Sequence, residues 1–372
     1  MLGGRKTSSD RLVAIWHIGA RDGYMPIAFP ASLDAGVDVL LIDAAEESCP
    51  PRLELADGRI PEICPQRLVA CVAGSTACRR FEVRVCPHAS GLFPFSSEFA
   101  EWSVFGNGQC DYVLGVAHAT ERSEDCHPVT VDQLCGEMGS QRPSMLIVDA
   151  QGASSEILLQ GARGVLSDLD AIVAEVELMP FYGEPASFAD LLPGLWRHGF
   201  AFSGFLEEAE SWATPACVPV GQRCAPLPGS KDAVFLRVPQ RFNWDGSFAR
   251  LSRYVTCCTI LGHVDFGLAV LLRTDADSVG SASSVFPFQS FTVDLWHAQR
   301  KMPRVFPPRW RPPSDRGPSV GAPTIAELTE LADMCPTPVE TVLRAYGFES
   351  TMHELQARRL VQARLLLNCR DD

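Results

Sequence analysis

The sequence predicts an α/β protein whose sheet is doubly wound and mostly parallel, with helices on both faces, followed by a C-terminal helical appendage. Three observations lead to this fold class. Residues 145–148 and 171–178 are apolar runs of the length typical of buried strands. Residues 157–166 carry apolar side chains at three- and four-residue spacing, which is typical of a helix packed on a sheet. Residues 12–18 form another apolar run, which leads into a glycine-containing turn.

Residues 145–182 form the central predicted βαβ unit. Polar side chains stand at the end of its first strand, where Asp149 and Gln151 follow the apolar run, and Glu175 interrupts the second strand. Ligands of parallel sheets bind outside the carboxyl ends of the strands. We therefore expect Asp149, Gln151 and Glu175 to gather at one site.

This central unit also resembles a known family. The run D-x-Q-G-A at 149–153, the Q-G-A at 160–162 and the segment AEVELMPFY at 174–182 are similar to the FkbM-type S-adenosylmethionine-dependent methyltransferases. The residues that fall on the family pattern are Asp149, Gln151, Gly152, Gly161, Ala162, Glu175, Pro180 and Tyr182. The resemblance spans about residues 12–272. It implies a Rossmann-like methyltransferase sheet, S-adenosyl-L-methionine as cofactor, and methyl transfer to a hydroxyl of a saccharide or secondary metabolite.

The turn after residues 12–18 is the predicted cofactor loop. Glycine allows positive φ and lets backbone N–H groups approach a ligand, although an ordinary turn often carries two glycines as well. The resemblance places His17 where related enzymes have an acidic residue that holds the methionine amino group. The cofactor-binding residues assigned here are His17, Gly19, Ala20, Asp22 and Gly23.

The second predicted strand, residues 37–42, ends in Asp43. An acidic residue at this position, about 20 residues after a glycine loop, can accept hydrogen bonds from ribose hydroxyls, so Asp43 completes the predicted cofactor site. The other interpretation is a solvated acidic loop, and it suits Glu46 and Glu47 better than Asp43.

The predicted chemistry is proton removal from the acceptor hydroxyl. Asp149 and Glu175 are the candidate general bases, and Gln151 would orient the acceptor or the cofactor. Asp149 and Gln151 could instead only cap the helix that follows them. A second function stays open, a catalytically impaired methyltransferase-like binding or scaffolding module, because His17, Ile147 and Ser154 depart from the family pattern.

The rest of the first 272 residues gives weaker signals, and residues 1–272 are predicted to form the methyltransferase-like domain. Further elements are expected as strands at 67–73, 81–85, 201–205 and 233–238, as a strand turning into a helix at 128–134, and as helices at 188–198 and 254–272. Pro193 is expected to kink or split the helix at 188–198.

The C-terminal part of the chain has a different composition. Residues 273–323 are rich in proline and serine and predict a linker or strap, and residues 324–372 predict a helical segment. The amphipathic helix at 352–367 would dock on the same chain or form a homo-oligomer contact.

Composition excludes several classes of partner. A formal net charge of −13 argues against nucleic acid, and no apolar run is long enough to span a membrane. The 14 cysteines include no C-x-x-C pair, which favours small buried thiols over a metal site. Together with the lack of a signal-peptide pattern, this predicts a cytoplasmic protein, and the family resemblance implies a small-molecule or glycan acceptor.

Overall fold

The computed structural model describes most of the first 270 residues. The described ranges are 13–29, 31–45, 52–106, 112–139, 142–183, 187–217, 226–241, 248–263, 266–267 and 270. The predicted linker at 273–323 and helical segment at 324–372, with the oligomer contact assigned to it, lie outside these ranges. The chain divides into two compact units, and the first, residues 1–243 and 252–261, holds the sheet and the candidate site.

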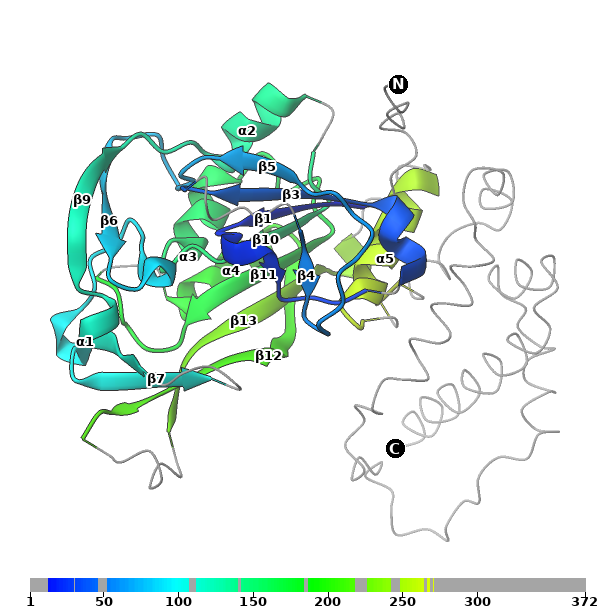
Figure 1. The fold of residues 1–372 in the computed structure, drawn as a ribbon. Helices are drawn as coiled ribbons and strands as arrows, with labels where there is room; N and C mark the ends of the chain where they lie inside the picture. The colour runs from blue at the N-terminus through cyan, green and yellow to red at the C-terminus, as the bar shows by residue number, and fades with distance from the viewer. Residues whose placement is uncertain are drawn as a thin grey trace, which may run out of the picture. The chain divides into compact units, whose positions relative to one another are not determined.

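Nine strands form one mixed sheet in the order β5-β3-β1-β10-β11-β13-β12-β7-β8 (Figure 1). In that order they span Gln66–Val69, Val37–Asp43, Val13–Ile18, Met145–Val148, Ala171–Glu177, Leu227–Arg237, Phe200–Pro215, Trp102–Gly106 and Tyr112–Val113. The first five strands are parallel to one another, and the four remaining pairings are antiparallel. The strands predicted at 12–18, 37–42, 145–148 and 171–178 are confirmed as β1, β3, β10 and β11.

The predicted fold class, a doubly wound and mostly parallel Rossmann-like sheet with helices on both faces, is wrong. Half of the strand pairings are antiparallel, and the helices of the described residues are few. They are α1 (Leu114–Ala117), α2 (Val131–Met138), α3 (Ser154–Glu156), α4 (Phe188–Arg197) and α5 (Phe248–Ile260). Three of them have fewer than ten residues, so they cannot cover both faces of a nine-stranded sheet.

The connections between strands explain this difference. Between β1 and β3 the chain forms the short 3-10 turns Arg21–Gly23 and Ala31–Gly36 and the two-residue strand β2 (Tyr24–Met25). Pro26 lies between them and has no N–H to give to a helix. Between β10 and β11, α3 passes into a π-helical turn at Ile157–Gly161 instead of a long α-helix.

The long connection between β5 and β10 also departs from the prediction. The segment predicted as a half-buried strand at 81–85 is part of β6 (Arg79–Arg84), which pairs with β9 (Thr120–Cys126) in a separate two-stranded sheet. The segment predicted as a strand turning into a helix at 128–134 forms helix α2, which begins at a capping box between Thr130 and Gln133.

Two helix predictions are also refined. Helix α4 continues through Pro193 as one element. Helix α5 begins at Phe248, before the predicted start at 254, and ends at Ile260.

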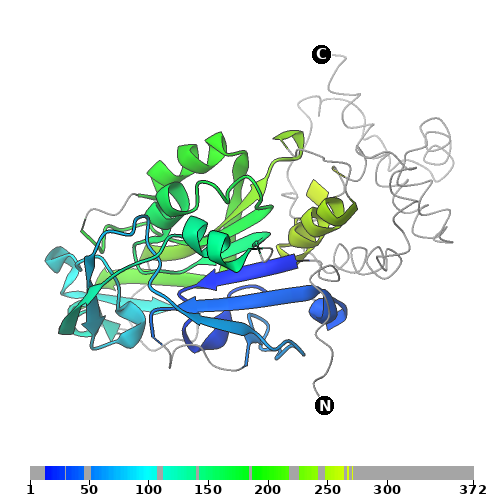
Figure 2. The same cartoon turned by 90° about the horizontal axis from the view of Figure 1, so that it is seen from above.

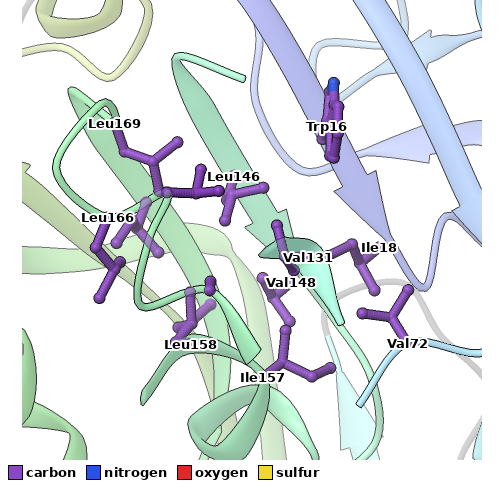
Figure 3. Close-up of a cluster of buried hydrophobic side chains, with 14 of the residues drawn as sticks. Trp16, Ile18, Val72, Val131, Leu146, Val148, Ile157, Leu158, Leu166 and Leu169 are labelled. Carbon is purple, nitrogen blue, oxygen red and sulfur yellow. The ribbon is translucent and has the colours of Figure 1, made fainter. Parts of the chain in front are cut away.

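The main core fills one face of the sheet. Trp16 and Ile18 of β1 pack there with Leu146 and Val148 of β10, and the helical side chains close over them. Figure 3 shows this cluster, which also includes Val72, Val131, Ile157, Leu158, Leu166 and Leu169. Helices α2 and α4 and the turn Ile157–Gly161 all contribute to it, so burial on this face orients the parallel strands.

The carboxyl ends of the parallel strands point toward the segment that holds β6, β9 and α1, as Figures 1 and 2 both show. This segment, residues 79–126, therefore lies at the edge of the sheet where the polar residues were expected.

Candidate functional site

The parallel strands bring three predicted residues together. The chain runs from β1 outward to β3 and β5, and then returns to the other side of β1 as β10 and β11, so the strand order reverses between β1 and β10. The N–H of Gly19 donates to Ile42 O at 2.9 Å, and the N–H of Asp149 donates to Ile18 O at 2.9 Å. The charge of Asp43 also acts on Asp149 and contributes to raising its pKa. Gly19, Asp43 and Asp149 thus share one edge of the sheet.

The glycine loop is packed tightly against the loop after β10. Gly19 has a φ of +79°, and a Cβ on it would lie 1.6 Å from the carbonyl oxygen of Asp149. The N–H groups of Gly19 and Ala20 both donate to Ile42 O, at 2.9 and 3.3 Å, and the Ala20 side chain is fully buried. These two N–H groups are therefore already hydrogen-bonded within the protein. The lack of a side chain at Gly19 lets the glycine loop and the loop after β10 pack closely.

The other end of the glycine loop faces solvent. Asp22 has a φ of +59° and its carboxylate contacts Nε2 of His88 at 3.0 Å, with both side chains more than half exposed. Gly23 is buried, with a φ of +70°. The loop therefore presents the Asp22 carboxylate at its surface and keeps Gly23 inside.

His17 and Asp43 differ in their surroundings. Asp43 is half-buried at the end of β3, and its Oδ1 accepts a hydrogen bond from the N–H of Ala45 at 3.0 Å. His17 is 3% exposed and lies on the opposite face of β1 from Trp16 and Ile18. Burial lowers the pKa of His17 to about 4, so its ring is neutral, and its Nδ1 has no hydrogen-bond partner among the described residues.

Gln151 joins the two candidate bases. Its Nε2 donates to Asp149 Oδ1 at 3.1 Å and to Glu175 Oε2 at 3.3 Å. The backbone of Gln151 has a φ of +42°, which is strained for a residue with a side chain, and Gly152 follows it at +82°. A Cβ on Gly152 would lie 2.9 Å from the ring of Tyr182. The tight turn after β10 therefore places the Gln151 amide between two carboxylates, and the structure brings all three predicted catalytic residues together.

Burial and mutual repulsion shift the pKa values of these acids. Burial raises the pKa of Glu175 well above its ordinary value, and the charge of Asp149 raises it further. Burial also raises the pKa of Asp149, while hydrogen bonds from Glu175 and Gln151 oppose that increase. Because the two carboxyl groups are coupled, they titrate as a pair. Their mutual hydrogen bond raises the pKa of Glu175 and lowers that of Asp149.

Two further acids in this cluster were missed by the sequence analysis. Burial raises the pKa of Glu177 to about 7 and that of Asp232 to about 8, with the charge of Asp149 adding to both. Glu177 could have been found, because residues two apart on a strand share a face and Glu175 was already a candidate. Asp232 lies opposite Glu175 in the antiparallel pairing of β11 with β13, and no local sequence pattern predicts this pairing.

A chain of hydrogen bonds leads away from the acids. The hydroxyl of Tyr182 donates to Gln151 Oε1 at 2.7 Å and lies 3.2 Å from Nε2 of His118. Nδ1 of His118 lies 3.0 Å from Leu114 O, and burial lowers the pKa of His118 to about 4. The neutral ring therefore gives its proton to Leu114 O, and its Nε2 can only accept. The single hydroxyl proton of Tyr182 then has two competing acceptors, Gln151 and His118.

Among the described residues, no group of three or more His, Cys, Asp or Glu side chains has the geometry to hold a metal ion. Within the same residues, no helix has the length and apolar character needed to cross a membrane. No known protein family and no curated protein matches the chain.

Proposed function

We propose that this protein is an S-adenosylmethionine-dependent O-methyltransferase that acts on a hydroxyl of a saccharide or secondary metabolite. The observation that carries the proposal is the cluster of Asp149, Gln151 and Glu175 at the carboxyl ends of β10 and β11, beside the glycine loop and Asp43. The proposal rests on this site and on the sequence resemblance, and not on the fold class.

The charge of the site suits a cationic ligand. Asp149, Glu175, Glu177 and Asp232 all have raised pKa values, because burial and mutual repulsion disfavour their ionised forms. A nearby positive charge removes part of that penalty. S-adenosylmethionine carries positive charge on its sulfonium and amino groups and supplies an activated methyl group when it is bound.

The residues present fit such a cofactor on one further point. His17 is buried and neutral, and its Nδ1 has no partner among the described residues, so it can serve a polar group of a ligand. We assign His17 and Asp43 to holding the cofactor, with Gly19, Ala20, Asp22 and Gly23 shaping the loop beside it.

The protein's own contribution to the chemistry is proton removal and alignment. Asp149 accepts the proton of the acceptor hydroxyl, and burial, which raises the pKa of Asp149, makes it a stronger base than an exposed carboxylate. Gln151 fixes both carboxylates, and its strained backbone holds the amide in place. Alignment of the two reactants supplies on the order of 7–11 kcal/mol in well-oriented systems.

A second function is favoured by one observation. The N–H groups of Gly19 and Ala20 are already bonded to Ile42 O, so they cannot donate to a cofactor without breaking those bonds. This arrangement suits a methyltransferase-like module that binds ligands without turnover. Such a module would bind S-adenosylmethionine weakly, or bind it without forming S-adenosylhomocysteine.

Calorimetric titration with S-adenosylmethionine tests the proposal. We expect micromolar binding with release of protons, because a cation lowers the pKa values of Glu177 and Asp232 from about 7 and about 8. The released protons are counted by repeating the titration in buffers of different ionisation enthalpy. S-adenosylhomocysteine, which lacks the sulfonium charge, should release fewer.

Variants separate the roles of the acids. Asp43→Ala should abolish binding, whereas Asp125→Ala, which removes the same charge from an exposed position, should not change it. Asp149→Asn should retain binding and lose formation of S-adenosylhomocysteine. Absence of any heat of binding at millimolar ligand would refute the proposal, and binding without turnover across a panel of hydroxyl acceptors would favour the second function.

A further inference from the structure

Arg84 is a buried arginine with two nitrogens that have no hydrogen-bond partner among the described residues. It lies at the end of β6 and is 2% exposed. One of its nitrogens, Nη2, donates to Phe93 O, but Nε and Nη1 are buried without a hydrogen-bond partner. Among the described residues, no carboxylate makes an ion pair with Arg84. The charge of Glu82 raises the pKa of Arg84 without a direct contact, and the Glu82 carboxylate accepts a hydrogen bond from Ser123.

Such an arrangement is costly in a folded protein. A buried cation needs a counter-charge or hydrogen bonds to replace the water it has lost, and each unmet donor adds to the cost. The ring of Tyr182 compensates in part, since the guanidinium carbon lies 5.4 Å from its centroid. Burial still lowers the pKa of Arg84. The contacts that Arg84 makes with other described residues therefore compensate its buried charge only in part.

The position of Arg84 connects it to the candidate site. Tyr182 contacts the guanidinium through its ring and donates its hydroxyl proton to Gln151, which in turn bonds Asp149 and Glu175. His118 also lies within reach of the Arg84 charge, which contributes to lowering the pKa of His118. The relay Tyr182–Gln151 thus has a buried cation at one end and paired carboxylates at the other.

We propose that Arg84 binds an anionic group, a carboxylate or a phosphate, of the molecule whose hydroxyl is presented to Asp149. This inference rests on the proposed function only in calling that molecule the methyl acceptor. The two ends of the relay suit a hydroxyl-bearing acid, such as a sugar acid or a sugar phosphate. The anion makes hydrogen bonds with the N–H groups on Nε and Nη1, and the acceptor hydroxyl faces the carboxylates. The acidic end repels the anion, so the same charges fix the direction in which the acceptor lies.

Thermal shift measurements with inorganic phosphate, D-glucuronate and D-glucose test this on the full chain. A ligand that binds only the folded state raises Tm in proportion to the logarithm of its concentration over Kd. We expect phosphate or glucuronate at millimolar concentration to raise Tm, and glucose, the neutral counterpart of glucuronate, to leave it unchanged. A shift with glucuronate alone identifies a carboxylate site, and a shift with phosphate alone identifies a phosphoryl site.

Two arginine variants on the same strand provide the matched comparison. Arg84→Gln should raise Kd for the anion by about 10- to 100-fold, from the strength of hydrogen bonds to charged groups. Arg80→Gln removes the same charge from β6 at a position where the side chain is 62% exposed and should leave Kd unchanged. If Arg84→Gln does not fold, Arg84→Lys keeps the charge, loses Nε, and should still raise Kd about tenfold.

The outcomes separate this inference from the proposed function. Equal anion shifts in the two glutamine variants, or no anion shift in the wild type, would overturn the role of Arg84 even if S-adenosylmethionine binds. An Arg84-dependent anion shift without S-adenosylmethionine binding would refute the methyltransferase proposal and leave the anion site standing.

Discussion

Replacing Gly19 by alanine tests the contact that joins the glycine loop to the candidate base. The new Cβ would fall 1.6 Å from Asp149 O, and the φ of +79° is itself unfavourable for alanine. The backbone strain costs about 1–2 kcal/mol. Relieving the overlap requires the two loops to separate and adds about 1–3 kcal/mol, as overpacking does in cores. We expect a loss of about 2–5 kcal/mol in the free energy of unfolding, and a displaced Asp149.

Gly58 supplies the control for this experiment. It has nearly the same φ, +77°, but a Cβ there has no atom within 4 Å, so Gly58→Ala carries only the backbone strain. Urea unfolding of both variants, followed by tryptophan fluorescence, gives the two free energies under the same conditions. The difference between them isolates the contact with Asp149. If Gly19→Ala costs no more than Gly58→Ala, the loops do not approach as described and the argument for a shared edge fails.

Two further predictions concern charge. Because the native pKa values of Glu177 (about 7) and Asp232 (about 8) exceed the ordinary values of 4.5 and 3.8, the folded state holds protons that the unfolded chain releases, and the free energy of unfolding should fall as pH rises from about 4 to about 8. Urea titrations across this window should show a shallower slope for Asp232→Asn, by at most about 1.4 kcal/mol per pH unit, and an unchanged slope would contradict the assignment. Glu156→Gln should cost about 1–3 kcal/mol, because Glu156 pairs with Arg79 and accepts the N–H of Gly74. Glu124→Gln, which breaks an exposed pair with Arg122, should cost about 1 kcal/mol or less, and equal losses would show that burial adds nothing.

The parallel part of the sheet could be predicted because its strands are buried on both faces. Met145 to Val148 are all buried, and so are Ala171 to Ala174, so each strand is a continuous apolar run that needs no knowledge of its neighbours. The polar residues that end these runs, Asp149 and Glu175, were found for the same reason. The helices could not be placed as well, since their lengths depend on how each connection closes. Residues 157–166 have the apolar spacing of a long helix, but the chain forms only the short helix α3 followed by the π-helical turn Ile157–Gly161.

The antiparallel strands were predicted only in part: the segments at 201–205 and 233–238 lie within β12 and β13, but β7, β8 and β9 were not expected as strands. Strand β9, with the sequence TERSEDC, lies in the two-stranded sheet with β6, and four of its first five side chains are exposed. Neither alternation nor apolar content therefore indicates a strand. Its partner β6 determines it instead. The pairing of Asp232 with Glu175 likewise depends on the register between β11 and β13, two strands that α4 and β12 separate in the chain. Residues that meet through long-range pairing were therefore the ones missed.

In strand β6, a difference between the predicted and the observed burial of side chains indicates a functional role. Its alternation, FEVRV at 81–85, predicts that the apolar side chains face inward. The structure has the reverse arrangement at the end of this run, where Arg84 is 2% exposed and Val85 is 48% exposed. Turning a valine outward and a guanidinium inward is unfavourable by burial alone. Departures of this kind are expected where a site requires them, and the inward residue here stands beside Tyr182, one hydrogen bond from Gln151. Arg84→Met, which keeps the length of the side chain and removes its charge, should therefore stabilise the fold while it abolishes anion binding. Loss of stability in that variant would instead assign Arg84 to holding the loop at Phe93.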